Sequence, residues 1–349
     1  MGRAELRDEA RRLDCAARNQ SGQWLPAIPI AFHHHPTAPR GVDRIVVAPN
    51  VSDTSAGRFQ IAGSRSKTRE RRLVLEKSAK PLRTHPKAAL PRKNEMESPN
   101  AIIITGASSG IGAALARRYI EDGATVGVCG RNRDRVLSVC GAAPRAIPLV
   151  FDVTDPAACE TAVKNFEEEA GALDLAILNA GYHLATDAAA FDLETCKRIM
   201  EINYFGALNC LAPTIEAMKT RRRGIIAMMG SAAATIGLPN AGAYCSSKSA
   251  VARITETLRV ELRAFNIDVR LITPGFVDTP LTARNEFPMP FLMPVEEAAA
   301  LIERGLSSKS YEISFPRRLI WGLRLASLLP RALYFKLAER LLPSERRTD

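Results

Sequence analysis

The stretch "TGASSGIG", from Thr105 to Gly112, follows the apolar run "AIII" and precedes a segment of helical periodicity. Glycines in such a turn allow positive φ angles and let backbone amides approach a bound group closely. The N-terminus of the following helix then attracts an anion. A tight turn without a ligand is the alternative, but the strand–turn–helix context favours a dinucleotide pyrophosphate site. The residues expected at this site are Gly106, Ser108, Ser109, Gly110, Ile111 and Gly112.

Short apolar runs alternate with longer helical segments on both sides of this stretch. The apolar runs are "AIIIT", "ATVGVCG", "AIPLVFDV", "LDLAILNAG", "GIIAMMGS", "IDVRLITPG" and "YEISF". The helical segments lie near residues 111–122, 132–140, 156–170, 193–220, 243–265 and 295–306. Fully apolar strands alternating with helices are typical of a parallel sheet covered on both faces. We therefore predict one doubly wound α/β Rossmann domain over residues 96–316, with a mostly seven-stranded parallel sheet that binds its ligand beyond the carboxyl ends of the strands.

Positive charge is concentrated at the N-terminus of the chain. Of a net charge of +11 over 349 residues, residues 1–95 contribute +10, and the remainder is nearly neutral. Nucleic acid is therefore not an expected partner of the body. The leader shows no sustained periodicity, so we predict that it is mostly disordered. A start assigned upstream of Met96 is the favoured explanation, and a targeting peptide or a basic interaction arm stays open.

The cysteines and histidines do not form a recognisable metal or disulfide pattern. The seven cysteines include no CxxC pair, and we interpret them as reduced thiols of a cytoplasmic chain. The tract His33–His35 has no nearby cysteine ligand, so no metal site is predicted. The sequence also lacks an uncharged apolar run of the ~20 residues that a membrane span needs.

The end of the second apolar run, "VCGRNRD", bears on the choice of cofactor. An acidic residue there would accept hydrogen bonds from the ribose of NAD. Gly130 leaves that position uncharged, and Arg131 follows with Arg133 nearby, which favours a ribose 2′-phosphate and hence NADP(H) over NAD(H). The alternative is that both arginines only solvate the start of a helix. Further cofactor contacts are expected at the ends of the third and fourth runs, from Asp152, Val153, Asn179, Ala180 and Gly181.

Over residues 98–316 the chain resembles the short-chain dehydrogenase/reductase family. The resemblance rests on "TGASSGIG", the "DV" pair, "NAG", "INYFG", Ser231, "YCSSK" and "PGFVDT", in this order and at family-like spacing. It implies a catalytic tetrad of Asn203, Ser231, Tyr244 and Lys248, and it implies that Tyr244 and Lys248 also contact the cofactor. It further implies that Pro274, Gly275 and Thr279 lie against the nicotinamide.

The tetrad also makes chemical sense residue by residue. A tyrosine has a reference pKa of ~10, and a nearby cation favours its phenolate. The i,i+4 spacing places Lys248 on the same helix face as Tyr244. Ser231 could orient the substrate oxygen, and Asn203 resembles the family residue that holds a water beside the lysine. Ser231 could instead cap a segment, and Asn203 could be a buried amide bonded to backbone.

These observations predict an NADPH-preferring oxidoreductase that moves a hydride between the nicotinamide and a carbonyl or secondary alcohol, with Tyr244 as acid/base. Two alternatives stay open: a non-catalytic NADP-binding regulator on the same fold, and an epimerase or dehydratase of the same family. The segment "PLTARNEFPMPFLMP" after "PGFVDT" offers Phe287, Met289, Phe291, Leu292 and Met293. They suggest a lipophilic substrate, although they could equally pack the core.

The C-terminal residues 317–349 extend past the last apolar run. Charges interrupt their apolar residues every few positions, as in an interfacial helix pair broken at Pro330, with Trp321 and Tyr334 as candidate anchors. We expect an amphipathic helical extension that makes peripheral membrane contact, which would add membrane association to a cytoplasmic location. A dimer contact or a helix folded onto the body is the alternative. We also expect the chain to form a homo-oligomer.

Overall fold

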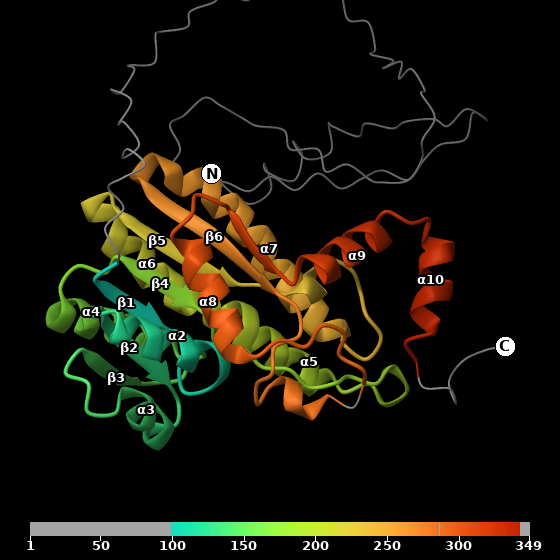
Figure 1. Ribbon diagram of the computed structural model, residues 1–349, viewed down its shortest axis with the longest axis horizontal. Helices are drawn as coiled ribbons and strands as arrows, with labels where there is room; N and C mark the ends of the chain where they lie inside the picture. Colours follow the sequence, from blue (N-terminus) through green and yellow to red (C-terminus); the bar gives the residue numbers. More distant parts are fainter. Residues whose placement is uncertain (1–98, 286, 343–349) are drawn as a thin grey trace, which may run out of the picture. The chain divides into compact units, whose positions relative to one another are not determined.

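The computed structural model describes residues 99–285 and 287–342 (Figure 1). The predicted leader, residues 1–95, lies outside the described residues. Seven strands form one parallel sheet in the order β3-β2-β1-β4-β5-β6-β7. They are β1 (Ala101–Ile104), β2 (Thr125–Gly130), β3 (Ala146–Val150), β4 (Leu175–Leu178), β5 (Gly224–Met229), β6 (Ile267–Pro274) and β7 (Glu312–Phe315). The predicted doubly wound parallel sheet is confirmed.

The strand order reverses direction between β1 and β4. Ile102 of β1 pairs with Val126 of β2 on one side and with Leu175 of β4 on the other. The chain therefore winds outward from β1 in one direction and then from β4 in the other. In open parallel sheets the crevice at such a switch point, beyond the carboxyl ends of the strands, is where ligands bind.

Nine α-helices, one π-turn and four 3₁₀-turns connect and extend the strands of the described residues. The α-helices are α2 (Gly110–Glu121), α3 (Arg133–Cys140), α4 (Pro156–Ala170), α5 (Leu193–Met200), α6 (Gly206–Arg221), α7 (Gly242–Glu261), α8 (Val295–Leu306), α9 (Arg317–Ser327) and α10 (Arg331–Glu339), and the π-turn is η3 (Glu201–Phe205). The 3₁₀-turns are η2 (Ala188–Ala190), η4 (Ala232–Ala234), η5 (Leu262–Phe265) and η6 (Thr282–Arg284).

Local signals in the sequence account for the ends of these helices, as α4 illustrates. The Asp155 carboxylate accepts hydrogen bonds from the backbone N–H groups of Ala157 and Ala158, and Pro156 occupies the first turn. An aspartate cap followed by proline is a strong helix start. The carboxylate accepts hydrogen bonds from N–H groups that would otherwise be unpaired, and proline has no N–H group to leave unpaired. Gly171 ends the helix at a φ of +83°, a conformation that favours glycine.

Helices cover both faces of the sheet, so the molecule has two apolar cores. Ile102 and Ile104 point into the core shared with α2, α3 and α8. Ala101 and Ile103, the alternate residues of the same strand, point into the core shared with α4, α6 and α7. Successive side chains of a strand face opposite sides, so a strand buried on both faces must be apolar throughout. This explains why "AIII" has no polar residue.

The C-terminal helices α9 and α10 follow β7 directly, and α9 contacts that strand (Figure 1). Within the described part of the chain, no helix combines the length and the apolar character that crossing a membrane requires.

Candidate active site

The turn between β1 and α2 has the backbone geometry that its glycines predict. Gly106 and Gly110 adopt φ angles of +65° and +54°, which side chains disfavour. Ser109 caps α2 in an extended conformation but makes no hydrogen bond to the helix through its side chain. The first-turn N–H groups of α2 therefore have no side-chain cap from Ser109, and the helix N-terminus points its partial positive charge at the crevice.

This turn packs tightly against the end of β4. A Cβ atom added to Gly106 would lie 2.8 Å from Cα of Ala180, and one added to Gly112 would lie 2.5 Å from the Gly106 carbonyl oxygen. The Asn179 amide donates hydrogen bonds to the Thr105 and Gly106 carbonyls at 3.0 and 3.2 Å. The turn is thus held in one conformation against the end of β4, as a cradle for the pyrophosphate of a dinucleotide requires.

Thr105 is a residue of this cradle that the sequence reasoning missed. Its hydroxyl accepts hydrogen bonds from the backbone N–H groups of Asn179 and Ala180, at 3.0 and 3.1 Å. The side chain is buried, so it joins the glycine turn to the fourth strand rather than contacting solvent. Its position as the first residue after β1 is the signal that could have indicated this role.

Replacement of Gly112 by alanine is expected to destabilise the fold and weaken dinucleotide binding. The new methyl group would lie 2.5 Å from the Gly106 carbonyl oxygen and 2.6 Å from Nδ2 of Asn179. The first atom belongs to the backbone, and the second is held by hydrogen bonds to two backbone carbonyls. Overpacking of this kind typically costs about 1–3 kcal/mol. Urea unfolding and NADPH titration would measure both effects. Gly322→Ala in α9 is the matched control, because nothing lies within 4 Å of its Cβ position. Equal stability of the two variants would contradict the tight approach.

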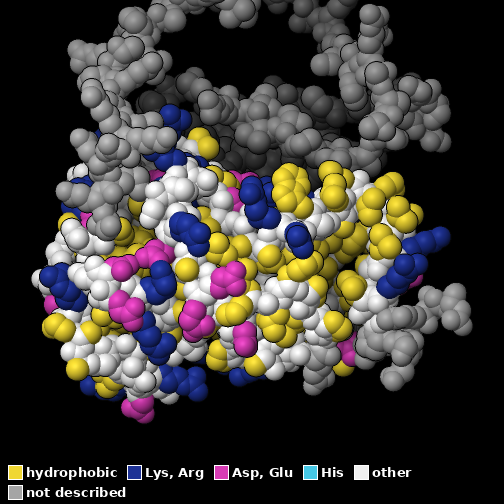
Figure 2. Space-filling view, in the orientation of Figure 1, with side chains coloured by type: hydrophobic (Ala, Val, Ile, Leu, Met, Phe, Trp, Pro, Cys, Tyr) yellow, Lys and Arg dark blue, Asp and Glu magenta, His cyan; other side chains and the backbone are white. Residues whose placement is uncertain are grey.

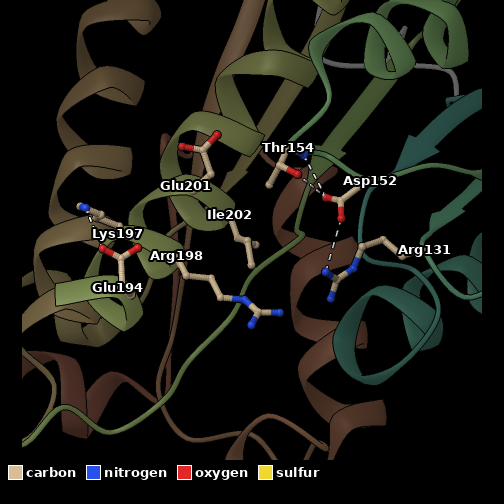
Figure 3. A pocket seen from close by; sticks show the side chains of 8 residues that line it. All are labelled: Arg131, Asp152, Thr154, Glu194, Lys197, Arg198, Glu201 and Ile202. Carbon is tan, nitrogen blue, oxygen red and sulfur yellow. Dashed lines mark hydrogen bonds and ion pairs between the residues drawn. The ribbon is translucent and has the colours of Figure 1, made fainter. Parts of the chain in front are cut away.

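Arg131 and Asp152 line a cavity beyond the ends of β2 and β3. The cavity has a volume of about 500 Å³ (Figure 3). It is lined by Arg131, Asp152, Thr154, Glu194, Lys197, Arg198, Glu201 and Ile202. Figure 3 shows Arg131 and Arg198 reaching into it from opposite sides. The lining holds three carboxylates as well as three cations, but Lys197 pairs with Glu194. The guanidinium groups of Arg131 and Arg198 both point into the cavity, where they can bind an anionic group. Arg198, which comes from α5, is a second residue that the sequence reasoning missed.

Asp152 is held as a carboxylate at the edge of this cavity. Partial burial acts to raise its pKa, but hydrogen bonds from the Thr154 backbone and hydroxyl and the charge of Arg131 outweigh burial, so the pKa lies below its ordinary value. Nη1 of Arg131 lies 3.4 Å from Oδ2 of Asp152. Because both side chains are exposed, this ion pair is weak, and Arg131 is available to another anion.

The remaining predicted cofactor residues lie partly beside the glycine turn and partly in the two apolar cores. Ser108 lies against Gly130, whose added Cβ would be 2.9 Å from the serine Cβ. Thr279 lies beside the glycine turn, since a Cβ on Gly110 would be 3.2 Å from its methyl group. Pro274 ends β6, and the Gly275 N–H donates to the Phe315 carbonyl at 2.7 Å. Ile111 packs against the first core, and Val153 is buried in the second.

Tyr244 and Ser231 approach one another across the loop between β5 and α7. Ser231 directly precedes η4, and its hydroxyl accepts a hydrogen bond from the Ala233 N–H at 3.1 Å, so the predicted capping role is present. Burial raises the pKa of the half-buried Tyr244, while a hydrogen bond from Ser231 acts to lower it. The net direction is upward, so burial outweighs the stabilisation of the phenolate. Tyr244 is therefore protonated at neutral pH.

Lys248 is one helical turn after Tyr244 and is only 3% exposed. Its ammonium group donates a hydrogen bond to the Met229 carbonyl at 2.8 Å and lies 5.9 Å from the centre of the Tyr244 ring. Burial lowers its pKa to about 8. Burying the ammonium group of Lys248 costs free energy, so a purely structural role is a poor explanation for a lysine at this position.

Asn203 lies in the π-turn η3 between α5 and α6 and is 1% exposed. Its side chain accepts from the Tyr182 N–H at 2.6 Å and donates to the Tyr182 carbonyl and the Ser247 hydroxyl. The amide is thus bonded to backbone, as the simpler alternative holds. A Cβ on Gly181 would lie 3.5 Å from Oδ1 of Asn203 and 3.6 Å from Nζ of Lys248. Both side chains therefore meet at the end of β4. π-turns inside helices are frequent at functional sites.

His183, in the loop that follows β4, contacts Tyr244. The two rings meet edge to face with their centres 4.7 Å apart. Its Nδ1 atom is buried without a hydrogen-bond partner, and burial lowers the pKa of the ring. Neutral His183 therefore supplies a wall for the tyrosine ring.

Known proteins that resemble this chain in sequence are oxidoreductases. Residues 100–288 match the family model described as short chain dehydrogenase. An uncharacterised oxidoreductase of Myxococcus xanthus is 36% identical over 243 residues, which is 68% of this chain and 96% of that protein. The 3-ketodihydrosphingosine reductase of Bos taurus is 30% identical over 188 residues, which cover 51% of this chain and 57% of the relative.

Solved structures show the same fold. The short-chain dehydrogenase from Burkholderia cenocepacia, solved in complex with NADP, is 29% identical with a TM-score of 0.62. The match covers 71% of this chain and all of that one.

Proposed function

This chain belongs to the short-chain dehydrogenase/reductase family, and we propose that it is an NADPH-preferring oxidoreductase acting on a carbonyl or secondary alcohol. The observation that carries the proposal is the position of Tyr244 and Lys248 on one face of α7, beside Ser231 and the end of β4. That group adjoins the glycine cradle. A proton donor and a dinucleotide site in one crevice are what hydride transfer to a carbonyl requires.

Each residue of the site has a distinct part in carbonyl reduction. The bound nicotinamide would supply the hydride to the carbonyl carbon. Tyr244, protonated at neutral pH, gives its phenolic proton to the carbonyl oxygen as the C=O double bond becomes a single bond. Ser231 donates a hydrogen bond to the same oxygen and orients it toward the phenol. The Lys248 cation stabilises the phenolate that remains, and it would also hold the ribose of a bound nicotinamide.

Asn203 acts behind these groups as a positioning residue. By holding both backbone groups of Tyr182 and the Ser247 hydroxyl, it fixes the end of β4 relative to α7. A water held there would link Lys248 to solvent, as the resemblance to the family implies.

NADPH is the proposed cofactor because Arg131 reaches into the cavity and Gly130 offers no carboxylate for a ribose hydroxyl. The B. cenocepacia structure, whose description names NADP, supports this choice. Pro274, Gly275 and Thr279 are proposed to lie against the nicotinamide, since Thr279 borders the glycine turn.

The proposed substrate is lipophilic. Phe287, Phe291 and Leu292, in the segment before α8, are exposed, whereas Met293 packs against the core and bridges to Val277. Three exposed apolar side chains in one short segment favour an apolar ligand. A relative named for its action on a ketodihydrosphingosine supports the same class. We extend the proposal to peripheral membrane contact through residues 317–349.

The full chain incubated with NADPH and panels of aliphatic, aromatic and steroid carbonyls tests the proposal through loss of NADPH absorbance. Turnover of an apolar carbonyl is the expected result. Binding of NADPH without turnover of any carbonyl or alcohol would favour a non-catalytic regulator, and redox-neutral conversion would favour an epimerase or dehydratase.

The rate of carbonyl reduction is expected to fall as the pH rises through about 8. Burial disfavours the ammonium form, so Lys248 is cationic below this pKa and neutral above it. The neutral amine no longer stabilises the phenolate left by proton transfer. A profile of kcat/KM against pH at saturating NADPH measures the break. Lys248→Arg is the control, because a guanidinium stays protonated and should move the break upward. A wild-type profile that stays flat well above this pH would contradict the assignment.

A further inference from the structure

The outward sides of α9 and α10 carry two rows of large apolar side chains. Trp321, Leu325 and Leu328, at i, i+4 and i+7, are 58%, 62% and 80% exposed. Leu333, Leu337 and Leu341 form the second row and are also exposed. We call these six residues the tail face. Figure 2 shows hydrophobic side chains gathered over α9 and α10, with basic side chains around them. Single exposed apolar residues are normal, but contiguous rows mark an interaction surface.

The opposite sides of both helices are anchored to the body. Ile320 of α9 is buried, and Leu319 lies against Gly275, whose added Cβ would be 2.7 Å from it. The Arg324 guanidinium pairs with Glu312 of β7. Tyr334 of α10 is buried and donates a hydrogen bond to the Gly237 carbonyl. These contacts fix the tail face in place, so its exposure is a property of folded structure.

The charges beside the tail face indicate what kind of partner it fits. Residues 317–342 contain six basic groups and one acidic group, Glu339. The basic residues are Arg317, Arg318, Arg324, Arg331, Lys336 and Arg340, of which Arg324 is already paired with Glu312. Leucine and tryptophan bordered by basic residues suit the boundary of an anionic bilayer. In a two-fold dimer the same surface meets itself, which would bring these basic groups together. The charge therefore favours lipid over a second copy.

The Tyr334 contact also joins the tail to the active site. Gly237 lies in the loop that runs from Ser231 to Tyr244, the two residues proposed to hold the substrate oxygen. A helix bonded to this loop sets the position of the loop relative to the tail face. Any surface that the tail face meets is thus brought next to the loop that carries the chemistry.

We propose that the tail face docks on an anionic lipid bilayer, and that the Tyr334–Gly237 hydrogen bond holds the substrate loop at that surface. A carbonyl compound dissolved in the bilayer then reaches Tyr244 directly from the lipid. The docking of the tail face is inferred from its exposed residues and charges and does not depend on the enzymatic activity. The route of the substrate rests on the proposed function.

Sedimentation of the full chain with vesicles tests the docking. We expect binding to phosphatidylcholine vesicles that contain phosphatidylserine, weakened by salt, and little binding without phosphatidylserine. Leu328→Glu should weaken binding about tenfold or more, because it removes a leucine that would insert into the bilayer and adds a charge that the anionic lipids repel. Val260→Glu is the matched control, since Val260 is equally exposed on α7 and is outside the tail face. It should bind as wild type does.

Three results would overturn the docking. They are absence of wild-type binding, an equal loss in Val260→Glu and Leu328→Glu, and dissociation of an oligomer by Leu328→Glu without vesicle binding by wild type. In the last case a second copy covers the tail face.

Turnover of the water-soluble ketone butanone separates the docking proposal from the enzymatic one, because Leu328→Glu should leave butanone turnover unchanged. If no variant turns over any ketone, the proposed function fails while the vesicle result still stands.

Tyr334→Phe tests the coupling, because it keeps the aromatic ring and removes the hydrogen bond to Gly237. Vesicle binding is expected to stay unchanged, and turnover of a long-chain methyl ketone dissolved in the vesicles should fall several-fold relative to butanone. An equal effect on both ketones, or none on either, would contradict the delivery of substrate from the bilayer.

Discussion

Replacement of Tyr244 by phenylalanine is expected to lower kcat for carbonyl reduction about a hundred- to ten-thousand-fold, the range for loss of a positioned general acid. The change keeps the ring, its edge-to-face contact with His183 and its place on α7. It removes only the hydroxyl that interacts with Ser231. Loss of NADPH absorbance with the best carbonyl substrate measures the effect, and fluorescence titration with NADPH should show nearly unchanged binding.

Tyr311→Phe is the matched control for this variant. The Tyr311 hydroxyl is buried without a hydrogen-bond partner and lies just before β7, away from the loop that carries Ser231. Its removal should leave kcat unchanged. Undiminished turnover by Tyr244→Phe would remove the central assignment, and a loss that accompanies failure to bind NADPH would point to a structural role for the phenol.

The parallel sheet is predictable from the sequence because its signal is local and repeated. Each buried strand must be apolar on both faces, so runs such as "AIII" stand out from the amphipathic helices between them. Helix ends also follow from local chemistry, as the Asp155 cap and Gly171 show. The glycine turn was predictable for the same reason, since strand, turn and helix are contiguous in the chain.

Features that depend on distant or irregular contacts could not be predicted in this way. The segment 193–220 has helical periodicity throughout, yet the structure has a π-turn at Glu201–Phe205 that holds Asn203. One irregular turn barely disturbs a periodic pattern. His183 and Arg198 reach Tyr244 and the Arg131 cavity only through tertiary structure. Their own neighbours in sequence give no indication of either contact.

The sequence of the C-terminal segment also does not determine which sides of its helices are covered. Its amphipathic pattern indicates that one side of each helix is apolar, but both α9 and α10 carry apolar residues on two sides. Ile320 and Tyr334 face the body, while Trp321 and Leu333 face outward. Only packing decides which of these are covered. The sequence alternatives of a membrane contact and a helix folded onto the body therefore describe opposite sides of the same helices.

Replacement of Arg131 by serine is expected to raise KM for NADPH about 10- to 100-fold and to leave KM for NADH within about twofold. A hydrogen bond to a charged group contributes more than one between neutral groups, and only NADPH carries the 2′-phosphate. Arg131 is suited to this contact because its ion pair with Asp152 is long and exposed. Initial rates over a range of each cofactor, at a fixed carbonyl concentration, measure the two constants.

Arg133→Ser is the control for the cofactor assignment, because Arg133 begins α3 and does not line the cavity. It should leave the preference for NADPH unchanged.

Arg198→Ser measures whether the guanidinium on the opposite side of the cavity also binds the phosphate. In that case the double variant loses more NADPH affinity than either single variant. Introducing a carboxylate at Gly130 is a poorer test, since a Cβ there would lie 2.9 Å from Cβ of Ser108 and disturb the glycine turn itself. If Arg131→Ser retains the full preference for NADPH while Arg198→Ser loses it, the phosphate contact belongs to α5. If neither variant changes the preference, the assignment of NADPH through this cavity is wrong.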